Sequence, residues 1–261
     1  LLEDTYNYVL LQESAGKEPH VDRKTWQQAL SHNVGSLDYD QLYSLVHILR
    51  ATGSSKGEFS AVTRRLEQQR MQDGTVRDPS SYLGTPDASL FVQQLRSVAG
   101  WPVRDKRLLA AVEEQANSQD APRDGAARLN LAALKHSAGG EPLSRQEAAL
   151  CQDPSTVPTP IAADNVVTWQ RAAWDCTESG VSIPAPSVTR WSVDDLERAQ
   201  AAATLVVGLH QASQEDRTPG WLTADALRRW ADDPGPRASV YDRALIVRAY
   251  LRLGGHADDS M

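Results

Sequence analysis

Two pairs of acidic residues have the spacing of catalytic carboxylates. Asp38 and Asp40 are separated by one residue, and Asp194 and Asp195 are adjacent. Paired carboxylates can act as general acid and general base when a substrate lies between them. Both pairs also precede apolar stretches, where acidic side chains cap the first turn of a helix and interact favourably with its dipole. Each pair therefore has a structural interpretation beside the catalytic one.

The neighbouring residues favour capping at both pairs. Ser36 precedes the first pair, and a leucine-rich stretch follows it. Ser192 stands three positions before Asp195, which is close to the spacing of a capping box. We therefore expect Asp38 and Asp40 to lie at one helix start, and Ser192 to be the N-cap of another helix.

Tryptophan is frequent in this chain, with seven residues, of which five lie in the later part. Indole rings can line a cavity that holds an apolar chain or a cation, but they also bridge packed helices as ordinary core. Core packing is the simpler interpretation. Because Trp191 adjoins the acidic turn, we nevertheless predict the mouth of a cavity there. The candidate ligand-binding residues are Trp169, Trp174, Trp191 and Trp221.

The sequence contains no motif for a metal or a cofactor. The six histidines are dispersed without a short ligand spacing such as H-E-x-x-H. A G-x-S-x-G elbow, a P-loop and a dinucleotide fingerprint are also missing from the sequence. We predict neither a metal nor a cofactor.

Composition argues against two classes of partner. The formal net charge is −7, and the basic residues are scattered rather than gathered in the stripe typical of nucleic-acid binding. No window approaches the roughly 20 apolar residues that span a bilayer. We therefore expect no nucleic-acid partner and no membrane span. Since the chain begins at Leu1 without a methionine, an exported protein whose signal segment was removed and a cytoplasmic protein both stay open.

The two cysteines, Cys151 and Cys176, flank a proline-rich connection. A disulfide between them would staple this segment, as happens in exported proteins. Two buried free thiols are an equal alternative.

The stretch from Arg190 to Gln211, RWSVDDLERAQAAATLVVGLHQ, organises the rest of the chain. After its acidic start it is apolar on every side from Ala199 to Leu209. A helix that is apolar all round is enclosed by other helices. We therefore predict that this helix is a central wall of the fold.

Helical spacing of apolar residues recurs along most of the chain and predicts an all-α fold. The expected segments are 4–15, 26–30, 36–52, 58–71, 86–99, 104–117, 124–138, 223–231 and 239–253. Five of them end near Gly16, Gly53, Gly100, Gly139 and Gly254, at intervals of 37, 47, 39 and 115 residues. Recurrence near 40 residues predicts stacked helical hairpins, which form an α/α toroid or a partial toroid.

Prolines concentrate in residues 153–189, where only residues 165–176 are expected to be helical. Prolines in extended conformations indicate an ordered arm laid across the helices. We therefore predict a single domain over residues 1–261 with a connecting arm at 153–189.

Two motifs resemble those of terpenoid cyclases and the β subunits of protein prenyltransferases. Leu66 to Gly74, LEQQRMQDG, is similar to their Q-x-x-D-G repeat ending. Ser192 to Asp195, SVDD, is similar to the D-x-D-D motif of class II terpene cyclases, with Ser192 in place of the first aspartate. The resemblance implies an α/α toroid. It also implies that Asp194 is a proton donor and Asp195 its neighbour, inside an apolar cavity that protects a carbocation from water.

Protein prenyltransferases in this family bind zinc through Asp, Cys and His, with the Asp and the Cys two positions apart. Here Asp175 and Cys176 are adjacent, and His210 and His256 do not complete a set. We therefore expect no zinc site.

The resemblance leads to three functional hypotheses. The first is a ligand-binding toroid protein that holds an apolar, isoprenoid-like molecule or an extended peptide in a central groove. The second is a class II cyclase-like enzyme that uses Asp194 as general acid. The third is a protein-interaction scaffold with a shallow concave face and no enclosed cavity. The oligomeric state stays open.

Overall fold

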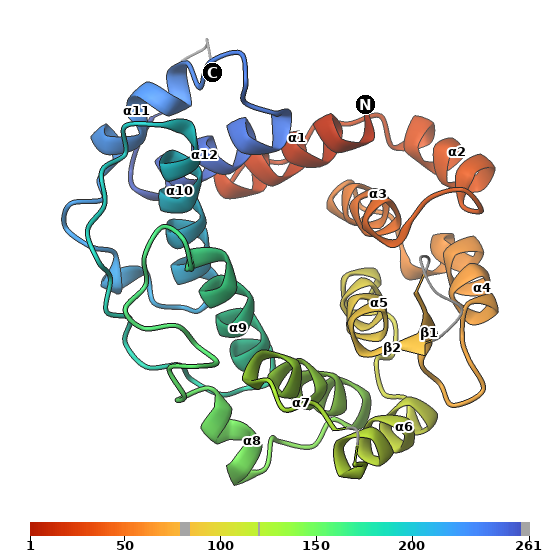
Figure 1. The fold of residues 1–261 in the computed structure, drawn as a ribbon. Helices are drawn as coiled ribbons and strands as arrows, with labels where there is room; N and C mark the ends of the chain where they lie inside the picture. Colours follow the sequence, from red (N-terminus) through yellow and green to blue (C-terminus); the bar gives the residue numbers. More distant parts are fainter. Residues whose placement is uncertain (79–83, 120, 257–261) are drawn as a thin grey trace. The chain divides into compact units, whose positions relative to one another are not determined.

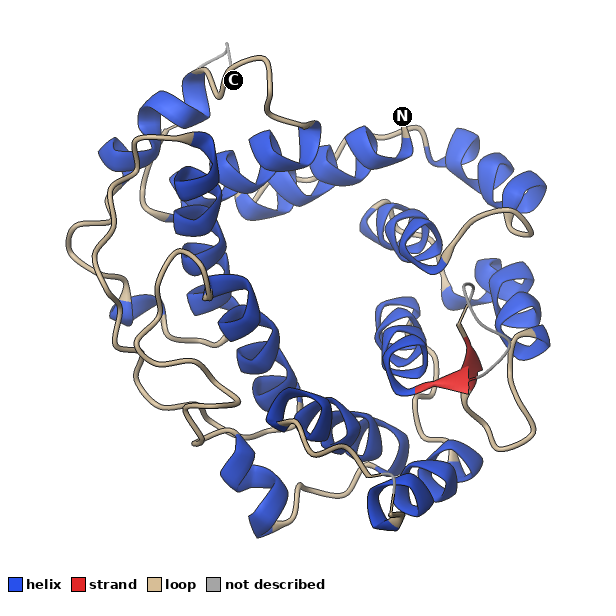
Figure 2. Ribbon diagram, in the orientation of Figure 1, coloured by secondary structure: helices blue, strands red, loops and turns tan. Residues whose placement is uncertain are grey.

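The computed structural model describes residues 1–78, 84–119 and 121–256. Within these residues the chain forms twelve α-helices, two 3-10 helices and one pair of short strands, so the predicted all-α class is confirmed (Figure 1). Figure 2 shows how little of the chain is strand. The helices are α1 (Leu2–Ser14), α2 (Arg23–Asn33), α3 (Tyr39–Ala51), η1 (Lys56–Phe59), α4 (Ser60–Gln68), α5 (Pro86–Ala99), α6 (Lys106–Asn117), α7 (Gly125–Gly139), α8 (Arg145–Leu150), α9 (Val166–Glu178), α10 (Leu196–Gln211), η2 (Glu215–Arg217), α11 (Ala224–Asp232) and α12 (Val240–Arg252).

Side-chain caps set most of the helix starts. The Thr85 hydroxyl accepts a hydrogen bond from the backbone N–H of Ala88, and Pro86 is the first residue of α5, as predicted. The N-cap residues of α6, α7, α11 and α12 are Asp105, Asp124, Thr223 and Ser239, respectively. These helices begin close to their predicted starts. Every helix in the described ranges is too short or too polar to cross a bilayer.

Two of the predicted helices differ from the observed ones. Helix α2 is longer than the predicted segment 26–30, because Asp22 caps its start by accepting a hydrogen bond from the Lys24 N–H. The predicted helix 58–71 is replaced by η1 and the shorter α4.

Glycines end several helices in the left-handed conformation. Gly16, Gly53 and Gly254 have φ angles of 66°, 85° and 85°. The ending predicted near Gly139 lies at Gly139 and Gly140: Gly139 is the last residue of α7, and Gly140 adopts the left-handed conformation with φ 77°.

An antiparallel pair of strands, each two residues long, was not predicted. Strand β1 (Val76–Arg77) pairs antiparallel with β2 (Gly84–Thr85). A Cβ atom on Gly84 would lie 1.8 Å from the Thr75 hydroxyl oxygen, so only glycine fits at this position. Residues 79–83, between the two strands, lie outside the described part of the chain.

The chain forms two compact units, one of Leu1–Val9 with Glu18–Ser144 and one of Leu10–Lys17 with Arg145–Met261. In the first unit α5 packs against both α3 and α7, while α2 packs on α3 and α6 packs on α7. The buried apolar side chains of α3, α4 and α5 join those of α2 and η1 in one core. That core includes Trp26, Leu42, Leu45, Ile48, Leu49, Phe59, Val62, Leu66, Val92 and Leu95.

In the second unit α10 packs against both α9 and α12, and α11 packs on α12. All residues of α10 from Ala201 to Leu209 are buried, which confirms the predicted enclosure of this helix. A Cβ atom on Gly208 would lie 2.7 Å from Cζ3 of Trp169, so the glycine allows α9 to approach closely.

A disulfide joins Cys151 and Cys176, with their Cα atoms 5.9 Å apart. Of the two alternatives for the cysteines, the structure therefore contains the bonded one. The non-helical parts of the predicted arm at 153–189 are held together by backbone hydrogen bonds on either side of α9. The Ile161 N–H donates to the Ser187 carbonyl at 2.7 Å, and the Thr189 N–H donates to the Ile161 carbonyl at 2.8 Å.

Candidate functional site

The predicted acidic turn is the start of α10. The Asp195 carboxylate accepts a hydrogen bond from the Arg198 backbone N–H at 2.8 Å and is the N-cap of the helix. The assignment of the cap to Ser192 was wrong, because the helix begins at Leu196 and the capping position falls three residues later.

Asp194 lies on the surface beside this cap. Its side chain is 64 % exposed, and its carboxylate is 3.6 Å from the guanidinium of Arg198. The Asp195 side chain is 58 % exposed, and Arg198 Nε lies 3.7 Å from its second carboxylate oxygen. A proton donor to an alkene needs burial and a neighbouring like charge to stay protonated. The exposed, ion-paired geometry at this turn lacks that burial.

Two of the four candidate tryptophans lie together near the start of α10. The rings of Trp191 and Trp221 meet edge to face, with centroids 5.0 Å apart. Trp191 Nε1 donates to the Arg198 carbonyl at 3.3 Å. Trp230, a third indole, donates to the Val193 carbonyl at 2.9 Å. These bonds fix the segment before α10 to the helices of its own unit.

The other two candidate tryptophans lie on α9. Trp169 is 1 % exposed and packs against Gly208, which corresponds to the core interpretation of this residue. Trp174 is half-buried on the same helix. The structure thus brings Trp191 and Trp221 into contact but uses Trp169 in the packing of α9 on α10.

Asp38 caps α3, as predicted. Its carboxylate accepts from the Gln41 N–H at 2.7 Å, and the Gln41 side chain accepts from the Asp38 N–H at 3.1 Å, which completes a capping box. Desolvation raises the pKa of Asp40, and the nearby charge of Asp38 raises it further. Asp38 and Asp40 therefore lie at a helix start, and neither residue lines the cavity or the groove described below.

Residues 69–74, the end of the stretch Leu66 to Gly74, form a tight turn beside α6. Asp73 accepts hydrogen bonds from the N–H and the hydroxyl of Thr75. Gly74 has φ 94°, and a Cβ atom there would lie 2.5 Å from the Leu108 backbone nitrogen. The glycine therefore has a steric role in packing the turn onto α6.

Next to this turn lies a small cavity of about 10 Å³. The charged residues beside it are Arg70, Arg96 and Asp105, and Arg70 and Arg96 also pair with Glu67. This volume is about one water molecule, so the cavity is too small for an organic ligand.

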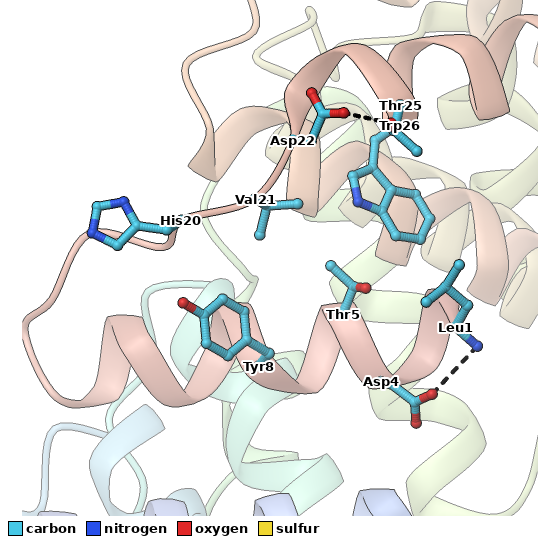
Figure 3. A pocket seen from close by; sticks show the side chains of 9 residues that line it. All are labelled: Leu1, Asp4, Thr5, Tyr8, His20, Val21, Asp22, Thr25 and Trp26. Carbon is cyan, nitrogen blue, oxygen red and sulfur yellow. Dashed lines mark hydrogen bonds and ion pairs between the residues drawn. The ribbon is translucent and has the colours of Figure 1, made fainter. Parts of the chain in front are cut away.

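A much larger groove of about 460 Å³ lies in the first unit (Figure 3). It is bounded by the start of α1, the start of α2 and the linker between them. Sites for small molecules typically have volumes of about 300–1,000 Å³, so the groove is large enough for a ligand. It is lined by Leu1, Asp4, Thr5, Tyr8, His20, Val21, Asp22, Thr25 and Trp26.

The middle of the groove is mainly apolar. Figure 3 shows Thr5 and Tyr8 projecting from α1, and Val21 and Trp26 projecting toward α1 from the opposite side. Trp26 is 8 % exposed and belongs to the core of the unit, against which Tyr8 and Val21 also pack. The walls of the groove are therefore held in place by core packing.

Carboxylates lie at the edges of the groove. Asp22 accepts hydrogen bonds from the Lys24 N–H and the Thr25 hydroxyl. The bond from Thr25 is the main cause of a lowered pKa at Asp22, which keeps this carboxylate ionised at neutral pH. Asp4 lies on the other side, 3.4 Å from the amino group of Leu1. In Figure 3 both carboxylates point away from the apolar middle.

The linker along the groove has free backbone groups. Residues 17–22 form neither helix nor strand. The backbone N–H groups of His20 and Val21 form no hydrogen bond to any other described residue. They are available to a ligand or to water.

No sequence pattern predicts this groove. Its residues come from two helices and a linker, and no spacing within one element joins them. The only sequence signal was Trp26, which stands far from the five later tryptophans.

The described residues contain no group of three His, Cys, Asp or Glu side chains arranged to hold a metal ion. Comparison with known proteins gives no relative: no family model, no curated protein and no solved structure matches the chain.

Proposed function

We propose that the protein is a binding protein that holds an apolar molecule or an extended peptide in the groove between α1 and α2. The observation that carries this proposal is the groove itself, with its apolar middle of Tyr8, Val21 and Trp26. Because these walls are fixed by the core, the ligand would meet a largely preformed site.

We also propose that the helices belong to a stack of helical hairpins of the α/α-toroid or partial-toroid type, as in the terpenoid cyclases that two motifs resemble. The support is the order of packing inside each unit. Helices α3, α5 and α7 pack in succession, and α2 and α6 each cover one of them. In the second unit α9, α10 and α12 pack in the same way, with α11 on α12.

Binding without catalysis is the hypothesis that the site geometry supports best. A cyclase would need Asp194 in an apolar enclosure, whereas its side chain is 64 % exposed and paired with Arg198. A binding role needs only the groove and its apolar side chains.

The proposal can be tested with a neutral apolar probe, N-phenyl-1-naphthylamine, whose fluorescence rises when it leaves water. Thr5→Phe places a ring in the groove, and Thr63→Phe places the same ring on an exposed position of α4. We expect saturable binding to the wild type and to Thr63→Phe, and binding weakened at least about tenfold in Thr5→Phe, because the ring removes the ligand's volume. Equal binding by all three folded proteins would contradict the proposal. Displacement of the probe by farnesol would favour an isoprenoid ligand.

A further inference from the structure

We propose that the groove between α1 and α2 binds an extended peptide segment in which a large apolar side chain is flanked on both sides by lysine or arginine. This inference rests on the proposed binding function and names its ligand. Three features of the groove support it: the charge at its edges, the free backbone groups of its linker and its apolar middle.

The charge of the lining is complementary to a basic peptide. The lining side chains include two carboxylates, Asp4 and Asp22, and no lysine or arginine. Asp4 lies 3.4 Å from the amino group of Leu1, and His20 also lines the groove. Since the carboxylates lie at the edges (Figure 3), they can meet basic side chains that flank the apolar middle.

Both carboxylates can accept further hydrogen bonds. A carboxylate has about four acceptor positions. Asp22 uses one for the Lys24 N–H and one for the Thr25 hydroxyl. The Asp4 side chain is 57 % exposed. An ammonium or guanidinium group can therefore bind at each edge without breaking the cap of α2.

The linker offers main-chain hydrogen bonds. Extended peptides bind beside exposed backbone groups, where main-chain hydrogen bonds supply affinity and side-chain pockets supply specificity. The N–H groups of His20 and Val21 are free to donate hydrogen bonds to such a peptide. Carbonyl groups of a peptide that lies along this linker would accept these hydrogen bonds.

The apolar middle then holds the central side chain of the peptide. An aromatic or leucine side chain would contact Tyr8, Val21 and Trp26, as buried anchors do in peptide complexes. A free isoprenoid would fill this middle as well, but it would use neither the remaining acceptor positions of the carboxylates nor the linker N–H groups. A peptide uses all three features.

The test uses three capped heptapeptides with a central phenylalanine, whose flanking residues are lysine, glutamine or glutamate. We expect the peptide with lysine flanks to bind most tightly, the one with glutamine flanks less tightly, and the one with glutamate flanks least tightly. The double variant Asp4→Asn/Asp22→Asn removes both charges, and asparagine keeps the cap of α2. It should weaken the lysine peptide by about fivefold, as expected for two exposed ion pairs, and leave the glutamine peptide unchanged. The control Glu113→Gln/Glu114→Gln removes the same charge from the exposed surface of α6 and should have no effect.

Hydrogen exchange measured by mass spectrometry provides the second readout. The lysine peptide should protect the amides of residues 18–22, whereas N-phenyl-1-naphthylamine should not. Equal affinity for the three peptides, or an unchanged lysine peptide affinity in Asp4→Asn/Asp22→Asn, would overturn the inference. Binding of the naphthylamine without binding of any peptide would overturn it and leave the proposed function intact. If neither the naphthylamine nor any peptide binds, both the inference and the proposed function are overturned.

Discussion

At the scale of single residues, Asp105 links the start of α6 to α5 and to the segment that follows α4. Its carboxylate caps α6 by accepting from the N–H groups of Arg107 and Leu108. The same side chain, only 6 % exposed, pairs with Arg70 and Arg96. Removing this charge would leave two partly buried guanidinium groups with Glu67, which is 48 % exposed, as their remaining shared partner. Removing one partner of a buried ion pair is costly, because the remaining charge stays desolvated.

We therefore predict that Asp105→Asn lowers the free energy of unfolding by about 2–4 kcal/mol, even though asparagine retains the cap. Urea unfolding followed by tryptophan fluorescence measures this loss. Asp124→Asn, at the exposed cap of α7, is the matched control and should change stability by less than about 0.5 kcal/mol. Similar losses in the two variants would show that the ion pairs contribute little.

The two acids before α10 should differ in their contribution to stability. Asp195→Ala removes the N-cap and should cost about 1 kcal/mol, whereas Asp194→Ala removes an exposed ion pair and should cost less than about 0.5 kcal/mol. Urea midpoints of the two variants and of Asp195→Asn, which retains a capping oxygen, give the comparison. A larger loss at Asp194 than at Asp195 would contradict the capping assignment.

At the scale of elements, sequence patterns located most helices, because caps and glycine endings are local features. Asp38 and Gly53 act as predicted, since each depends only on residues that are close to it in sequence. The hairpin of β1 and β2 could not be predicted, because its pairing depends on the fit of Gly84 against Thr75. The groove could not be predicted for a similar reason: it depends on how the linker places the start of α2 near the start of α1.

The disulfide should be the main staple of the arm. It closes a loop with a sequence separation of 25 residues, for which the chain-entropy model gives a stabilisation of about 3.5 kcal/mol. We predict that Cys151→Ala/Cys176→Ala loses about this much stability in urea unfolding. Dithiothreitol should lower the midpoint of the wild type and leave that of the variant unchanged. A wild-type midpoint that does not respond to reductant would contradict this role.

At the scale of the whole molecule, the single domain predicted over residues 1–261 can be tested in solution. One compact domain of this length has a radius of gyration of about 18 Å. Small-angle X-ray scattering should give this value if the two units form one domain. A value above about 22 Å would instead indicate two units that move independently.

Photo-cross-linking tests the central claim, that the groove between α1 and α2 is the ligand site, most directly. An apolar probe carrying a benzophenone would be irradiated with the protein, and the labelled peptides identified by mass spectrometry. We predict labels on residues 4–8 and 20–26, which line the groove, and their loss in Thr5→Phe. Labels confined to the segment from Trp191 to Asp195 would contradict the account.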